Sequence, residues 1–230
     1  YISMTCDTDD VAARDGYLAF VEHVAPKLTP LFFELDKRLV DLAAAISPDQ
    51  SRYAVLIRGA KADVELFRDE NVPLETQLAV LGQQYEHLCG TMTVTFDGTE
   101  KTMPQMARYQ EQTDRSTRET AWRAVANRRM QDVDTISGIY DEMIDLRTKV
   151  GKNAGFENFV GYAYKSKHRF DYGPADCAKF HKACEVAVVP LTRELERQRK
   201  AHLKVDELRP WDLSVDVKGR GPLTPFTNGR

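Results

Sequence analysis

Hydrophobic residues recur every three or four positions along most of the chain, and this spacing is typical of α-helices that bury one face. Pro26 and Pro30 are expected to divide the first such stretch into two helices, because proline lacks the backbone donor that a helix interior needs. Ser47-Pro48 is expected to end that stretch, and two short helices are expected near residues 53–57 and 60–68. The longer helical stretches are residues 11–46, 74–88, 116–150, 157–167 and 174–203.

Residues 91–103 follow a different pattern, in which side chains alternate with a period of two. The segment is rich in β-branched residues, and Asp97-Gly98 divides it with a pair that favours the tight turn of a β-hairpin. The sequence therefore predicts one antiparallel hairpin at about 91–103. Because an isolated hairpin is only marginally stable in water, this one is expected to pack on helices.

Two places match the capping box, in which two side chains satisfy backbone donors at a helix start. They are Thr102 with Gln105 and Ser116 with Glu119. The stretch 116–150 contains no proline, and it is expected to form one long helix.

The last helical stretch contains Pro190, where we expect a kink. Together the patterns predict a mainly α fold, an antiparallel helical array with one β-hairpin. The chain has 230 residues, which allows one large domain or two small ones.

Composition and charge exclude several classes of protein. The 32 basic and 35 acidic residues leave a net charge of −3, so no strong field would draw the chain to nucleic acid or an anionic membrane. No apolar run approaches the roughly 20 residues that a transmembrane helix needs. The four cysteines are too sparse for a disulfide framework, and we expect a cytoplasmic protein.

One group of residues has the chemistry of a metal site. Cys177, His181 and Cys184 are four and three residues apart, which places them on one face of a helix. Thiolate and imidazole groups suit zinc, but a single helix supplies only part of a tetrahedral site. The competing interpretation is that the two thiols are small packing residues. The chain contains no HExxH motif.

Other candidate chemistry has a simpler interpretation. Asp141, Glu142 and Asp145 lie close together and could act as acid and base, but they also fit the solvated face of an amphipathic helix. The basic stretches 165–169 and 193–200 are interrupted by acidic and apolar residues, so they do not form a nucleic-acid stripe. GxSxG, P-loop and GxGxxG motifs are absent. The residues alone therefore indicate no complete catalytic group.

Several segments, taken in order, resemble a known family. They are YEHLCGT at 85–91, VTFDGTEKTM at 94–103, TDRSTRE at 113–119, IYD at 139–141 with Arg147, AGFENF at 154–159 and LRPWDL at 208–213. This order resembles the helical N-terminal half of the oligoendopeptidase F group of zinc metallopeptidases, which is related to the thimet-oligopeptidase class. The matches extend over about residues 1–226.

The resemblance implies part of a helical clam-shell around a deep channel that admits short, unfolded peptides. In that family an HExxH helix and a later glutamate hold zinc, the metal polarises the scissile carbonyl and activates water, and the motif glutamate is the general base. That motif follows the RPWDL-like segment. The resemblance therefore implies no catalytic, cofactor-binding or metal-ligating residue within this chain. It implies a channel-forming region at 1–213 and a linker at 214–230 into a missing catalytic domain.

Three hypotheses about function follow. The first is the N-terminal segment of a zinc metalloendopeptidase, which forms the channel wall, is inactive alone, and has oligopeptide substrates and the missing C-terminal half as partners. The second is a non-catalytic helical module that binds a peptide or a partner helix. The third is a small metal-sensing domain that uses Cys177, His181 and Cys184.

Overall fold

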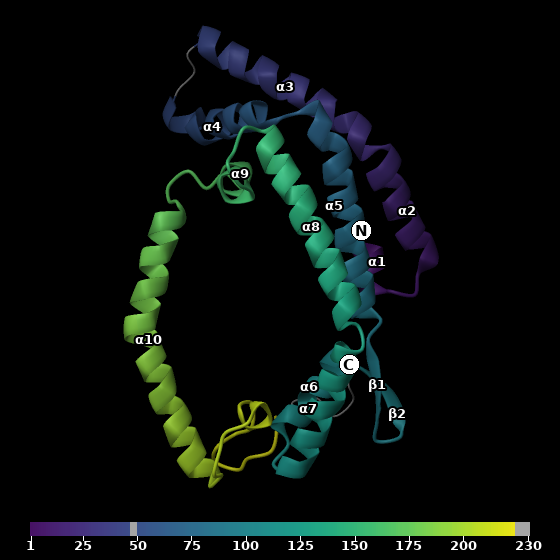
Figure 1. The fold of residues 1–230 in the computed structure, drawn as a ribbon, viewed down its shortest axis with the longest axis vertical. Helices are drawn as coiled ribbons and strands as arrows, with labels where there is room; N and C mark the ends of the chain where they lie inside the picture. Colours follow the sequence, from purple (N-terminus) through teal and green to yellow (C-terminus); the bar gives the residue numbers. More distant parts are fainter. Residues whose placement is uncertain (47–49, 224–230) are drawn as a thin grey trace. The chain divides into compact units, whose positions relative to one another are not determined.

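The computed structural model describes residues 1–46 and 50–223, so the expected helix end at Ser47-Pro48 lies outside the described residues. The chain is mainly helical with one two-stranded antiparallel sheet, which confirms the predicted fold class (Figure 1). It divides into two compact units, and each unit combines two separate stretches of sequence. The first unit is Tyr1–Gly90 with Thr135–Ala175, and the second is Thr91–Asp134 with Asp176–Arg230.

The described elements of the first unit are all helices. Its elements are α1 (Ile2–Cys6), α2 (Val11–His23), α3 (Ala25–Ile46), α4 (Gln50–Leu66), η1 (Asp69–Asn71), α5 (Val72–Gly90), most of α8 (Val133–Asn153) and α9 (Phe159–Ser166). The predicted division of the first stretch is confirmed, but it falls at Val24, and Pro30 lies inside α3. The prediction of two short helices at 53–57 and 60–68 is wrong, because α4 is one helix that continues through Gly59.

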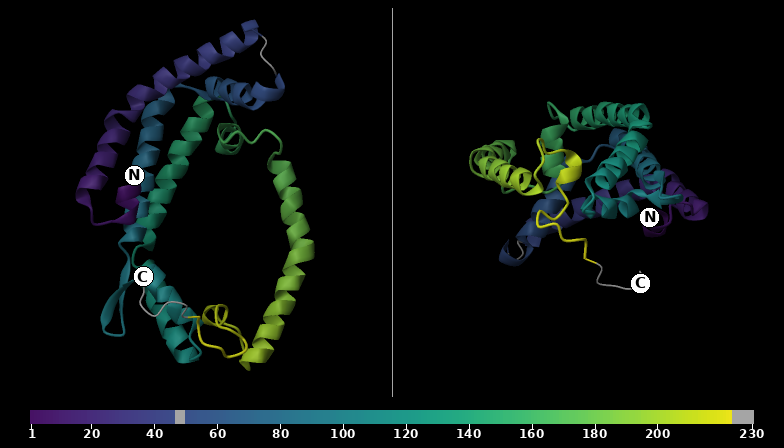
Figure 2. Two further views of the ribbon diagram at one scale, coloured as in Figure 1. Left: turned by 180° about the vertical axis from the view of Figure 1, so that it is seen from behind. Right: turned by 90° about the horizontal axis from the view of Figure 1, so that it is seen from below.

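The core of the first unit joins α4, α5, α8 and α9. Leu66, Val150, Ala154 and Tyr162 are buried there, with half-buried side chains of α5 and α9 packed around them. Through this core α5 and α8 lie side by side, as Figure 2 shows from behind. Gly151 allows the close approach of α9, because a Cβ there would lie 3.2 Å from the Cα of Phe159.

A buried asparagine links η1 to the end of α8. Asn71 is 2% exposed, and its side-chain amide donates to the carbonyl oxygen of Val150 over 3.1 Å. Its own oxygen accepts from Asn153 over 2.8 Å, and Arg68 donates to the carbonyl oxygen of Asn153. The start of α5 is thereby fixed to the end of α8, where the backbone carbonyls of a helix have no partner within the helix.

The second unit contains the hairpin. Strands β1 (Thr93–Phe96) and β2 (Thr99–Thr102) pair antiparallel with Val94 opposite Lys101, which confirms the predicted hairpin. Asp97 and Gly98 form its turn with positive φ angles of 51° and 71°. The other elements are α6 (Met103–Ala107), η2 (Arg108–Glu111), α7 (Arg115–Met130), nearly all of α10 (Pro174–Leu203) and η3 (Pro210–Asp212).

A small core packs the hairpin against α6 and α7, as the pattern required. It consists of Val94, Met106, Tyr109 and Ala121, with Met106 1% exposed and Ala121 fully buried. By contrast, neither α10 in this unit nor α3 in the first has a residue classed as buried. These two helices therefore present apolar side chains to solvent in the described chain, among them Phe32, Leu35 and Ile46 of α3 and Phe180, Leu191 and Leu195 of α10.

Two details of the helix starts and ends differ from the sequence-based expectation. The capping box of Thr102 and Gln105 is present, but the one at Ser116 is wrong, because Asp114 caps α7 by accepting from the backbone N–H of Thr117 over 2.7 Å. The single helix predicted over 116–150 is also wrong: α7 ends at Met130 and α8 begins at Val133. At the break, Gln131 donates to a carbonyl three residues back instead of four, which tightens and ends the helix.

The remaining helix predictions agree with the structure. The helix at 174–203 matches α10 and passes continuously through Pro190, while the kink expected there stays a prediction. The described residues contain no helix that is both long enough and apolar enough to cross a bilayer.

Candidate functional site

Two of the segments that carry the family resemblance lie together in the second unit. The side chain of Asp212 accepts hydrogen bonds from Arg115 at 2.9 and 2.8 Å and from Arg118 at 3.1 Å. It also accepts from the backbone N–H of Arg209 at 3.0 Å. The carboxylate is fully buried, yet four donors surround it. We call Arg115, Arg118 and Asp212 the arginine–aspartate cluster.

The local structure explains how the cluster forms. Arg115 and Arg118 are three residues apart in the first turn of α7, so they project from the same face. The 3-10 turn η3 presents Asp212 to that face. The N-terminus of a helix also favours a nearby negative charge, because its free N–H groups carry partial positive charge.

Arg118 is the most constrained member. It is 3% exposed, and its guanidinium also donates to the carbonyl oxygens of Trp211 at 2.8 Å and of Gln112 and Thr113 at 2.9 Å. One side chain therefore holds the loop before α7 and the segment of η3 together. A buried arginine of this kind is stable only when nearly all of its donors are used.

The tryptophan of the RPWDL segment packs beside the cluster. The Trp211 ring lies 5.5 Å from that of Trp122 and 5.0 Å from the guanidinium of Arg123, within cation–π range. Its Nε1 atom is buried without an acceptor among the described residues. From α10, Arg199 donates to the carbonyl oxygens of Asp212 at 3.3 Å and Val215 at 2.8 Å. The segment after α10 is thus held by hydrogen bonds from α7 and from α10.

Electrostatics show what the cluster can do. Burial alone would raise the pKa of Asp212, but the hydrogen bonds from Arg115, from the backbone N–H of Arg209 and from Arg118 outweigh burial and lower the pKa to about 2. A carboxylate held this way stays ionised near neutral pH, which suits a structural contact better than proton transfer. The cluster instead positions the chain that follows α10.

Acid is therefore expected to destabilise the second unit through Asp212. Because the folded-state pKa lies below the unfolded value of 3.8, this contribution is complete above about pH 4 and is lost as the pH falls toward 2. The shift corresponds to about 2 kcal/mol. Denaturant titrations between pH 6 and pH 2 should show it, read by the fluorescence of Trp122 and Trp211. The variant Asp212→Asn should lack this component; an unchanged pH slope in the variant would contradict the assignment.

A second polar contact joins Tyr162, a core residue of the first unit, to the exposed residue Glu75. The Tyr162 hydroxyl donates to Glu75 over 3.0 Å. Burial raises the pKa of Glu75, although the hydrogen bond from Tyr162 opposes this shift. The pKa of Tyr162 is also raised, first by burial and then by the negative charge of Glu75. In the described part of the chain this tyrosine–carboxylate pair belongs to no group of three or more His, Cys, Asp or Glu side chains that could hold a metal ion.

The residues considered for a metal site do not assemble into one. Cys177 and Cys184 are half-buried and His181 is exposed on α10. Within the described residues no three or more His, Cys, Asp or Glu side chains are grouped closely enough to hold a metal ion. Asp141, Glu142 and Asp145 are exposed on α8, as expected for a solvated face. That no residue of this chain is catalytic stays a prediction.

The two basic stretches form local ion pairs. In the stretch 165–169, Lys165 pairs with Glu65, and Nε2 of His168 lies 2.8 Å from Oδ1 of Asp63. In the second, Arg197 pairs with Glu194 one helical turn away. These contacts balance positive charge with nearby negative charge.

Sequence reasoning identified both motifs of the arginine–aspartate cluster but missed their pairing. Arg118 and Asp212 are 94 positions apart. The available signal was the presence of arginines in one motif and an aspartate beside a tryptophan in the other. Opposite charges in apolar surroundings tend to be paired when they are buried.

Comparison with solved structures defines the class of protein. The chain shares its fold with a protein described as oligoendopeptidase F from Bacillus anthracis str. Ames, with a TM-score of 0.84 and 27% identity. The similarity covers 94% of this chain and 39% of that one. PZ peptidase A, solved with an inhibitor, has a TM-score of 0.85 and 27% sequence identity to this chain. The similarity covers 94% of this chain and 38% of PZ peptidase A. Another structure described as oligoendopeptidase F, at 24% identity and a TM-score of 0.88, supports the fold alone.

The sequence gives the same result. Residues 108–218, which include the arginine–aspartate cluster, match the model of peptidase family M3. No curated protein sequence matches the chain. The resemblance to the oligoendopeptidase F group is confirmed by this match to the model of peptidase family M3 and by the solved structures. It spans only 38–39% of the length of the relatives named here.

Proposed function

We propose that this chain is the N-terminal, channel-forming part of a zinc metalloendopeptidase that hydrolyses oligopeptides. One observation carries the proposal: the similarity to the oligoendopeptidase F relative covers 94% of this chain but only 39% of the relative. The M3 family match over residues 108–218 supports the same assignment. Residues 1–213 as the channel wall and 214–230 as a linker to a catalytic domain are part of this proposal.

The described residues do not fit the zinc ion on which family M3 depends. They contain no group of three metal-ligating side chains. We therefore assign the hydrolytic chemistry to residues outside this chain and assign to the chain a restrictive and supporting role. The exposed apolar side chains of α3 and α10, such as Leu35 and Leu191, support this role, since they suit contact with unfolded peptide or with further protein.

A comparison of two purified proteins tests the proposal. One is the 230-residue chain, and the other is the product of the coding region extended past Arg230. We expect the chain alone to bind less than one equivalent of zinc and to leave an internally quenched peptide intact. The extended protein should contain an HExxH helix, hold one zinc, and lose its cleavage activity on chelation. Zinc is measured by elemental analysis and cleavage by fluorescence.

Two outcomes would overturn the proposal. The first is stoichiometric zinc or peptide cleavage by the 230-residue chain itself. The second is an extended coding region that lacks the motif, which would favour the non-catalytic peptide- or partner-binding module. Thiol-dependent metal uptake that Cys184→Ala abolishes would instead support the metal-sensing hypothesis. Location in the cytoplasm stays a prediction.

A further inference from the structure

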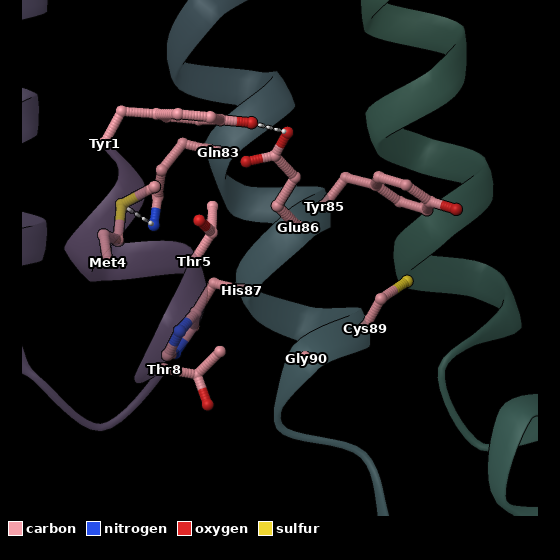
Figure 3. Close-up of a pocket in the computed structure, with 10 residues that line it drawn as sticks. All are labelled: Tyr1, Met4, Thr5, Thr8, Gln83, Tyr85, Glu86, His87, Cys89 and Gly90. Atoms are coloured by element: carbon pink, nitrogen blue, oxygen red, sulfur yellow. Dashed lines mark hydrogen bonds between the residues drawn. The ribbon is translucent and has the colours of Figure 1, made fainter. Parts of the chain in front are cut away.

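A pocket of about 360 Å³ lies in the first unit between α1 and the C-terminal half of α5 (Figure 3). This volume is in the lower part of the range for sites that bind small molecules. Tyr1, Met4 and Thr8 line it from the N-terminal side, and Gln83 and Gly90 line it from α5. The arginine–aspartate cluster belongs to the other unit, so the pocket is separate from it.

The walls of the pocket are built by specific contacts. The Tyr1 hydroxyl donates to Glu86 over 3.0 Å, and the Tyr1 ring lies 5.4 Å from that of Tyr17. At the other end, a Cβ on Gly90 would lie 2.6 Å from a methyl carbon of Thr8, so a larger residue there would require the Thr8 side chain to move. Figure 3 shows the Tyr1 ring over one end of the pocket and Thr8 beside Gly90 at the other.

One polar group inside the pocket is poorly satisfied. Gln83 is 6% exposed, and among the described residues its side chain makes a single hydrogen bond, from Nε2 to the sulfur of Met4 at 3.8 Å. A thioether is a weak acceptor. Buried side-chain amides normally bond through both their oxygen and their nitrogen. Gln83 therefore retains an accepting oxygen and donor capacity at the pocket.

We propose that this pocket binds a small neutral molecule that carries one secondary amide on an apolar body. The ligand carbonyl would accept from Gln83 Nε2, and the ligand N–H would donate to Gln83 Oε1. Its apolar body would lie against Met4 and the Tyr1 ring. A neutral ligand is favoured because Gln83 is uncharged, the Glu86 carboxylate at the pocket already accepts from the Tyr1 hydroxyl, and burial of an unpaired charge is costly. This inference does not depend on the proposed peptidase function.

The test uses two probes of equal size, N-methylbenzamide and methyl benzoate, which differ in the amide N–H. Binding to the 230-residue chain is followed by ¹H–¹⁵N NMR. We expect the amide to shift the Gln83 side-chain signal and the backbone signals of Met4 and Gly90, with a dissociation constant on the order of 1 mM for a ligand of this size. The ester should bind at least about tenfold more weakly, since it cannot donate to Gln83 Oε1.

Variants of α5 make the test specific. Gln83→Leu should weaken binding of the amide probe at least about tenfold, because it removes both hydrogen bonds and keeps the apolar volume. The matched control is Gln77→Leu, an exposed glutamine on the same helix, which should bind as the parent does. Should Gln83→Leu fail to fold, Gln83→Met replaces it. Equal binding of amide and ester, full binding by the Gln83 variant, or no saturable shift would overturn the proposal.

Discussion

Replacement of Asp212 by asparagine is expected to lower the unfolding free energy of the second unit by about 3–5 kcal/mol, the usual effect of removing one partner from a buried ion pair. The change leaves Arg118 charged at 3% exposure without its carboxylate. It also replaces one carboxylate oxygen, which accepts hydrogen bonds from the arginines, by an amide NH₂ group, which can only donate. The expected loss is a large fraction of the stability of an ordinary domain.

Tryptophan fluorescence isolates the unit concerned. The chain has two tryptophans, and both Trp122 and Trp211 lie in the second unit beside the cluster. Guanidinium titrations of the parent and Asp212→Asn, read by this signal, give the difference directly. The control is Asp216→Asn, which removes a carboxylate paired with Arg220 at the surface and should change the midpoint very little. Equal shifts in both variants would contradict a structural role for the cluster.

Replacement of Asn71 by aspartate is expected to destabilise the first unit by about 3 kcal/mol. The new side chain keeps its shape but loses one of the two donors to the Val150 carbonyl, the other being the backbone N–H of Ala154, and it buries a negative charge at a site that is 2% exposed. Asn153 can still donate to the aspartate, which limits the loss. The result should be faster amide exchange at the end of α8 and the start of α5.

Hydrogen exchange followed by mass spectrometry measures this effect peptide by peptide, and it requires no tryptophan in the first unit. The matched control is Asn127→Asp, since Asn127 is an exposed residue of α7. That control should leave exchange in α5 and α8 unchanged. If Asn71→Asp exchanges like the parent in these helices, the linkage of η1 to α8 contributes little to stability.

Local patterns predicted the elements of this fold where local physics decides them. The apolar spacing of α5 and α10 and the Asp97-Gly98 turn were sufficient to place three elements. The break between α7 and α8 was missed because it contains neither proline nor glycine, and the apolar spacing continues across it. Whether a helix stops there depends on how its two halves pack, which is information that a single stretch of sequence does not carry.

The missed continuity of α4 has a similar cause. The break predicted between residues 57 and 60 is absent, and in the structure the ring of His168 packs against Gly59, 3.2 Å from where a Cβ would lie. A contact with a residue more than one hundred positions away cannot be deduced from local spacing. The same holds for Arg118 and Asp212: their motifs were identifiable from the sequence, whereas their pairing depends on how η3 packs against α7.

The interleaving of the two units has a consequence for synthesis on the ribosome. The chain passes from one unit to the other after Gly90, after Asp134 and after Ala175. The first 90 residues therefore emerge long before α8 and α9, which supply Val150 and Tyr162 to their core. Until residue 175 has left the exit tunnel, the early helices carry an unfinished apolar surface, and native contacts this distant in sequence form slowly. The nascent N-terminal helices are therefore expected to need a holding chaperone until residue 175 has emerged.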